Sequence, residues 1–140
     1  MKNQIKLGTH IIIINEAKEI LLCKRVKKFG FGEWILPGGH VEFQETFEQN
    51  LERECKEELG IKVKVGKLVS VATNMKYENH YVIFTFLCES YSGKPERNEP
   101  HEHSEIKWFN VDNLPENLFI STKYALEDFL SGNICGNIQS

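Results

Sequence analysis

Apolar runs with strand character dominate the first part of the chain. Residues 6–14 and 19–25 are rich in Ile and Leu, and the polar residues 15–18 between them suit a turn. These two runs predict a pair of strands joined as a β-hairpin. Residues 34–36, 81–88 and 105–111 predict three further strands, and residues 61–71 predict one strand or a bent pair.

The apolar spacing becomes helical in two places. One stripe recurs at every fourth position: Phe47, Leu51, Cys55 and Leu59. Thr46, with Gln49 three residues later, fits a capping box, so we expect this helix to begin near Thr46. Gly60 is a typical residue for the end of a helix. Residues 121–130 predict a second helix by the same spacing.

The remaining segments predict loops and a tail. Residues 26–33, 90–103 and 112–116 are polar or contain Gly and Pro, and the Gly- and Asn-containing tail from Ser131 is expected to be frayed. Strands and helices alternate, which indicates an α/β (α+β) protein. We expect one domain over residues 1–140, with an ordered core over about residues 5–130 and a flexible C-terminal tail.

Charge and composition exclude several classes of function. The net charge of −3 gives no reason to expect a nucleic-acid polymer as a partner, and no apolar run is long enough to span a membrane. The N-terminus lacks the apolar segment of a signal peptide. The four cysteines are scattered without a C-x-x-C pair, which favours free thiols in a reducing compartment. We therefore expect a cytoplasmic protein.

An acidic cluster on the first helix carries the clearest chemistry. Glu54, Glu57 and Glu58 have i, i+3 and i+4 spacing and so share one helix face, where like charges repel. A divalent cation that prefers oxygen ligands would relieve that repulsion. A solvated acidic face is the alternative. Gly38 and Gly39, just before the helix, predict a sharp turn at its entrance.

The whole segment resembles the signature of the Nudix hydrolase family, G-x5-E-x7-R-E-U-x-E-E-x-G-U, where U is a bulky aliphatic residue. The matching residues are Gly39, Glu45, Arg53, Glu54, Glu57, Glu58, Gly60 and Ile61. Cys55 stands where an aliphatic residue is usual, and a buried cysteine packs as a small hydrophobe. The chain is similar to the MutT-like nucleoside triphosphate pyrophosphohydrolases within that family. The resemblance implies the Nudix fold, a mixed β-sheet sandwiched between α-helices.

The resemblance also implies an activity. Nudix enzymes hydrolyse a nucleoside diphosphate linked to another group, with Mg2+ as the metal and Mn2+ able to substitute. We expect a nucleoside triphosphate, including one with an oxidised base, to be converted to the monophosphate and pyrophosphate. ADP-ribose and dinucleoside polyphosphates are the alternative substrates. A nucleotide-binding module without turnover, or a protein-interaction surface without metal, are the alternative functions, and the protein is expected to be a monomer or a homodimer.

Roles follow from the same resemblance. The expected metal ligands are Glu54, Glu57, Glu58, Glu45 and the carbonyl of Gly38. Arg53 is expected to orient a ligating carboxylate, the alternative being a surface i, i+4 pair with Glu57. The general base is either Glu54 or a carboxylate before the last strand. Glu99, Glu102 and Glu105 compete for that second place, and we favour Glu102.

Substrate contacts are expected from the segments beside the signature. Arg25, within a basic cluster, is the leading candidate for binding phosphate, and His40, Gly38 and Gly39 are expected to line the site. Several aromatic residues are candidates for stacking on a base, although an aromatic residue more often packs in a core. They are Phe29, Phe31, Tyr77, His80 and Phe119.

Overall fold

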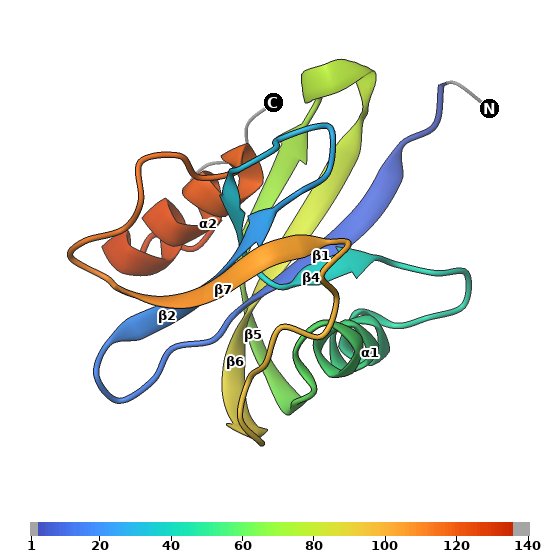
Figure 1. The fold of residues 1–140 in the computed structure, drawn as a ribbon. Helices are drawn as coiled ribbons and strands as arrows, with labels where there is room; N and C mark the ends of the chain where they lie inside the picture. Colours follow the sequence, from blue (N-terminus) through green and yellow to red (C-terminus); the bar gives the residue numbers. More distant parts are fainter. Residues whose placement is uncertain (1–2, 136–140) are drawn as a thin grey trace.

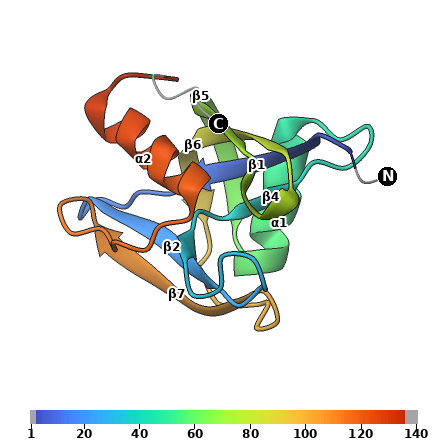
Figure 2. The same cartoon turned by 90° about the horizontal axis from the view of Figure 1, so that it is seen from above.

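The computed structural model describes residues 3–135, in which two β-sheets lie between two helices (Figures 1 and 2). The strands are β1 (Lys6–Ile12), β2 (Glu19–Arg25), β3 (Trp34–Ile35), β4 (Gly38–His40), β5 (Lys62–Asn74), β6 (Tyr81–Ser92) and β7 (His103–Asn110). The helices are α1 (Phe47–Leu59) and α2 (Ile120–Ser131), and η1 (Lys76–Glu78) is a short 3-10 turn. The expected fold class, helices on both sides of mixed β-structure, is confirmed.

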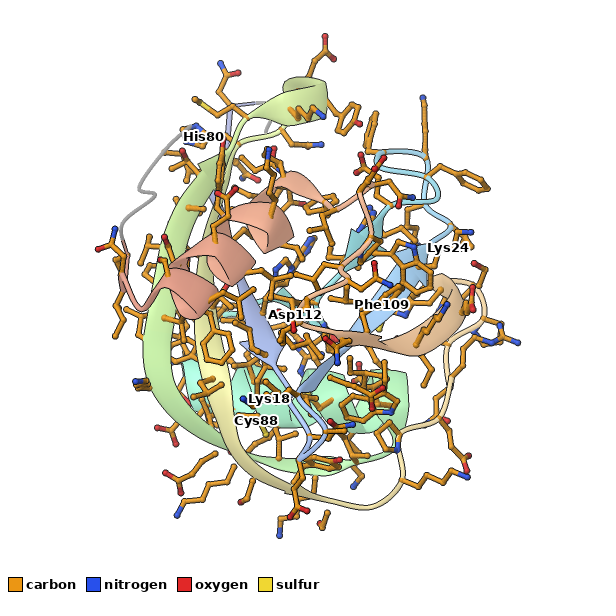
Figure 3. All side chains as sticks on the ribbon, turned by 90° about the vertical axis from the view of Figure 1, so that its left-hand side faces the viewer. Lys18, Lys24, His80, Cys88, Phe109 and Asp112 are labelled. Carbon is orange, nitrogen blue, oxygen red and sulfur yellow. The ribbon has the colours of Figure 1, made fainter. Side chains whose placement is uncertain are left out.

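The larger sheet is mixed and has the order β4-β1-β6-β5. β1 runs parallel to β6, with Lys6 opposite Tyr81, and the other neighbours are antiparallel. β5 is one strand whose register shifts as it bends along β6. Figure 3 shows β6 running from the end of the molecule near His80 past Cys88, with the long curved ribbon of β5 beside it. The smaller sheet has the order β3-β2-β7 and is antiparallel.

The predicted hairpin between the first two strands forms only at its turn. The Asn15 N–H donates to the Glu19 carbonyl at 3.0 Å and Ile14 forms an antiparallel bridge with Ile20. Beyond that bridge the strands part, because β1 pairs with β4 and β6, and β2 pairs with β3 and β7. Residues 11–13 and 20–23 are fully buried, so these strands have no solvated face. A strand that is buried on both faces contributes side chains to two cores. Here the two strands also belong to two different sheets.

Two hydrophobic clusters result from this arrangement. Alternate residues of a strand point to opposite faces, so β1 and β2 contribute to both clusters. Ile11, Ile13, Leu21 and Cys23 pack with Leu51, Cys55 and Leu59 of α1. Ile12, Ile20 and Leu22 pack with Ala125 and Leu126 of α2. The two helices therefore cover opposite sides of the strands, as Figure 2 shows.

The boundaries of α1 are those expected from the sequence. The Thr46 side chain accepts a hydrogen bond from the Gln49 N–H, and the Gln49 side chain accepts one from the Thr46 N–H, which completes the capping box. Gly60 ends the helix in the left-handed conformation, with φ of 69°. Leu51, Cys55 and Leu59 are fully buried, so Cys55 occupies its position as a core residue.

Several segments differ from their expected limits. β6 continues to Ser92 and β7 begins at His103, so the loop between them is shorter than predicted. β4 and η1 are additional elements. In the expected tail, the Cys135 N–H donates to the Val69 carbonyl at 3.0 Å, and residues 136–140 lie outside the described residues. All four cysteines are free thiols, and no helix within residues 3–135 is long and apolar enough to cross a membrane.

Candidate active site

One cleft of about 590 Å³ gathers most of the residues selected from the sequence. It is bounded by β4, by the acidic face of α1, and by loops from both sheets. From the predicted set it is lined by Arg25, Gly38, Gly39, His40, Arg53, Glu54, Glu57, Glu58 and Glu102. Glu45 is not part of the lining, although it lies directly behind it.

The glycines of β4 allow the strand to approach α1 closely. The Gly38 N–H donates to Glu58 Oε1 at 2.9 Å, and the strand pairs with β1 so that Gly39 lies opposite Thr9. A Cβ atom at Gly39 would overlap the Glu54 carboxylate, and one at Gly38 would overlap the Thr9 carbonyl. Two residues without side chains are therefore required where the turn meets the carboxylates.

The three carboxylates of α1 differ in exposure. The side chains of Glu54 and Glu58 are 15% and 8% exposed, whereas that of Glu57 is 48% exposed. Burial raises the pKa of Glu54 to about 7 despite the nearby charge of Arg53, and the other carboxylates add to the rise. Burial also raises the pKa of Glu58, against the hydrogen bond from Gly38. Both carboxyl groups are therefore partly withdrawn from water, which disfavours their charged form.

The loop between β6 and β7 adds two more carboxylates. Its backbone is fixed to the last turn of α1, because the Glu96 N–H donates to the Leu59 carbonyl at 3.0 Å and the Asn98 N–H donates to the Glu58 carbonyl at 3.1 Å. Glu99 and Glu102 both line the cleft. Glu105, the third candidate, is instead on β7 opposite Lys24 and outside the lining.

Arg53 connects the parts of the signature. Its Nε atom donates to Glu45 Oε2 at 2.7 Å and its Nη2 atom to Glu45 Oε1 at 3.1 Å, a bidentate pair. Its Nη1 atom donates to Glu57 Oε2 at 3.3 Å. The i, i+4 contact between Arg53 and Glu57 is thus present, and the role of Arg53 in orienting a ligating carboxylate stays a prediction. The hydrogen bond from Arg53 lowers the pKa of Glu45 to about 2, and Asn50 and the Glu42 N–H also donate to that carboxylate.

Asn50 is a site residue that the sequence did not reveal. It is fully buried on α1, one turn before Glu54. Its Nδ2 atom donates to the His40 carbonyl at 2.7 Å and to Glu45 Oε1 at 3.1 Å, and its Oδ1 atom accepts a hydrogen bond from the buried Thr9 hydroxyl. A single asparagine has no spacing signal, and its partner Thr9 lies 41 residues away in the sequence.

Two buried histidines were also missed. His10 and His103 each have about 5% of their surface exposed and line the cleft. Burial lowers the pKa of His10 to about 3 and that of His103 to about 4, so both are neutral at pH 7. His103 Nε2 lies 3.7 Å from Glu58 Oε2. His40, which was expected, has its Nε2 atom 3.0 Å from the Tyr81 hydroxyl.

Arg25 lines the cleft beside the β6–β7 loop, because it pairs with His103 at the start of β7. Its Nε atom donates to the Phe29 carbonyl at 3.0 Å, and its guanidinium lies 4.9 Å from the centre of the Phe119 ring. Lys27, two residues later, forms an ion pair of 3.1 Å with Glu102. Cationic and anionic side chains therefore line the same cleft, an arrangement suited to a polyanion that also binds a cation.

The donor set fits a hard divalent cation. Glu54, Glu57, Glu58, Glu99 and Glu102 supply only oxygen ligands. Burial raises the pKa of Glu54, Glu58 and Glu99, and neighbouring carboxylates add to each rise. Within residues 3–135, no group of three or more His, Cys, Asp or Glu side chains is placed so that it could hold a metal ion. Mg2+ usually takes one or two carboxylates and completes its shell with waters and substrate phosphates.

Comparisons with known proteins agree with this geometry. The model of the NUDIX domain matches residues 5–129. The chain is 32% identical to the ADP-ribose pyrophosphatase of Methanocaldococcus jannaschii, covering 84% of this chain and 69% of that protein. It is also 32% identical to the 8-oxo-dGTP diphosphatase of Escherichia coli (strain K12), covering 81% and 88%. One curated relative is much longer than this chain, because the match covers only 29% of that relative's length.

Among solved structures, the MutT NUDIX hydrolase from Burkholderia pseudomallei superposes with a TM-score of 0.84 at 35% identity. The match covers 90% of this chain and 98% of that one. The signature, the cleft and these matches agree, and the chain belongs to the Nudix hydrolase family as a MutT-like hydrolase of phosphoric anhydride bonds.

Proposed function

We propose that the protein hydrolyses nucleoside triphosphates, including those with an oxidised base, to the monophosphate and pyrophosphate in a reaction that needs Mg2+ or Mn2+. The observation that carries this proposal is the convergence of five carboxylates, from α1 and the β6–β7 loop, on one cleft that Arg25 also lines. The 8-oxo-dGTP diphosphatase activity named for the Escherichia coli relative supports it.

The residues of the cleft have separate roles in a phosphoryl-transfer reaction. Glu54, Glu57 and Glu58, with the Gly38 carbonyl, would hold the cation, which neutralises phosphate charge when bound. Arg25, which lines the same cleft, would bind phosphate oxygens. A water oxygen forms a bond to phosphorus, the bridging P–O bond breaks, and pyrophosphate leaves with the bonding electrons. Glu102 or Glu99 accepts the proton that the water releases.

Glu45 has a different role in this proposal from that of a metal ligand. Both of its oxygens accept hydrogen bonds from Arg53, Asn50 or the Glu42 N–H, and its side chain is 13% exposed. Its carboxylate therefore positions Arg53, which in turn contacts Glu57. Groups that orient ligating side chains commonly affect activity 10- to 100-fold.

ADP-ribose is the second candidate substrate, because the Methanocaldococcus jannaschii relative is named an ADP-ribose pyrophosphatase. Both substrates carry a pyrophosphate linked to a nucleoside, so the carboxylate cluster serves either. The choice between them depends on the part of the cleft that holds the rest of the substrate.

A substrate panel tests the proposal. The nucleotide products would be separated by chromatography and measured from dNTPs, oxidised dNTPs, ADP-ribose and dinucleoside polyphosphates, with Mg2+ and with EDTA. Glu57→Gln should lose most activity, whereas Glu52→Gln, an exposed residue of the same helix, should match the wild type. The absence of turnover on every substrate, with Mg2+ present and the protein folded, would contradict the proposal in favour of a binding module.

A further inference from the structure

Two aromatic rings from separate loops stack on each other within the cleft. Phe29 comes from the loop between β2 and β3, and Tyr77 comes from η1 between β5 and β6. Their ring centres lie 5.2 Å apart at an interplanar angle of 20°, and both residues line the cleft. Each is 40% exposed, so the pair is not part of a core. Figure 1 shows the two segments at the same end of the molecule.

The backbone that carries Tyr77 is strained. Tyr77 has φ of 57° and Glu78 has φ of 62°, two consecutive left-handed residues that are not glycine. Asn74 Oδ1 accepts from the Lys76 N–H at 3.0 Å, and the Asn79 N–H donates to the Lys76 carbonyl at 3.2 Å, which together hold the turn. Such strain persists where surrounding structure enforces it, typically in ligand clamps.

Cations border the two rings. Lys76 Nζ lies 5.5 Å from the centre of the Tyr77 ring, and Lys28 Nζ lies 5.5 Å from the centre of the Phe29 ring. Arg25 donates to the Phe29 carbonyl, so the loop that presents Phe29 is joined directly to the candidate phosphate-binding residue. One part of the cleft thus offers carboxylates for a metal. Another part offers two flat aromatic rings with lysine side chains beside them.

We propose that the Phe29–Tyr77 clasp, meaning these two stacked rings, parts to receive the planar base of the substrate and holds it by stacking. This inference rests on the proposed function and names the part of the substrate that the clasp recognises. Every base has a flat π face, so stacking selects for the presence of a base and tolerates its identity. The clasp would therefore favour nucleoside-linked pyrophosphates over pyrophosphates without a base.

Calorimetric binding without turnover tests the clasp. The probes are a non-hydrolysable α,β-methylene dGTP and, as the base-free control, methylenediphosphonate, both in Mg2+. Tyr77→Ala should weaken binding of the nucleotide analogue about tenfold and leave methylenediphosphonate within about twofold. Tyr77→Phe keeps the ring and should bind like the wild type. Phe43→Ala is the control for loss of an exposed ring, because Phe43 is exposed and lies outside the cleft lining.

One more variant separates the effect of the backbone strain at Tyr77 from the effect of its ring. Tyr77→Gly removes the ring and also the left-handed strain, so it should bind the nucleotide analogue as weakly as Tyr77→Ala but melt at a higher temperature. The clasp is overturned if Tyr77→Ala weakens both probes equally or neither, or if the wild type binds both probes alike. Binding that follows these expectations without any hydrolysis would refute the proposed function alone, and a wild type that binds neither probe would refute both.

Discussion

Asn50 joins three parts of the site through a single buried amide. It holds Thr9 of β1, the carbonyl of His40 in β4, and the Glu45 carboxylate, all from a position one turn before Glu54. A buried amide is sensitive to change, because removing it leaves several partners without hydrogen bonds. Its position in the family signature is unspecified, so its importance follows only from these contacts.

Replacing Asn50 with Leu, which has a similar size and no polar atoms, should therefore disturb the geometry of the site as well as lower the melting temperature. We expect kcat to fall 10- to 100-fold and the Mn2+ concentration for half-maximal activation to rise, with KM within about threefold. Steady-state kinetics and Mn2+ binding by electron paramagnetic resonance give the two readouts. Glu52→Gln is the control, and a variant that only lowers the melting temperature would show that Asn50 is merely structural.

At the scale of elements, β4 is the strand whose position matters most. It has three residues, pairs with β1, and contacts Glu54 and Glu58 through its glycines. The short strand and the helix can approach each other only because Gly39 has no side chain. A shift of about 1 Å in such a contact can cost 100-fold in rate.

The variant Gly39→Ala tests this contact. The added methyl group must displace the Glu54 carboxylate, so we expect about a 100-fold loss of kcat/KM. Gly32→Ala is the matched control: its Cβ meets no atom within 4 Å, and its φ of +80° makes the substitution costly only in stability. Equal activity of Gly39→Ala and Gly32→Ala would contradict the close packing of β4 on α1.

The elements also show which parts of the fold the sequence could predict. The limits of α1 depend on Thr46, Gln49 and Gly60, whose interactions span only a few residues, and they were predicted correctly. The pairing of β1 depends on β6, whose paired residues lie 75 positions later, and no local pattern reveals it. The acidic residues were found because the family signature fixes their spacing, whereas Asn50, His10 and His103 required the folded chain.

At the scale of the whole molecule, charge in the cleft couples metal binding to stability and pH. Glu54 has a pKa of about 7 when folded, above the value of about 4.3 for an exposed Glu. Between these two pH values, Glu54 therefore keeps its proton in the folded protein and has released it in the unfolded protein. For this group, the metal-free protein is most stable below about pH 4.3 and loses stability as the pH rises to about 7.

A divalent cation should reverse this trend, because it competes with protons for the same carboxylates. We expect Mn2+ at about 100 times its Kd to stabilise the protein by about 2.7 kcal/mol at pH 8. That corresponds to a rise in melting temperature of roughly 10 °C, with a smaller rise at pH 5.5. Melting curves with Mn2+ and with EDTA at both pH values measure the effect. A Glu54→Gln protein with an unchanged pH dependence would contradict the assignment.

Because most of the cysteines are buried, the reactivity of the thiols measures unfolding. Cys23, Cys55 and Cys88 are buried, and burial raises the pKa of each thiol, whereas Cys135 is partly exposed. A thiol reagent should therefore modify one cysteine in each native molecule and all four in each unfolded one. The stoichiometry of labelling would report the unfolded fraction directly, without an optical probe near the cleft.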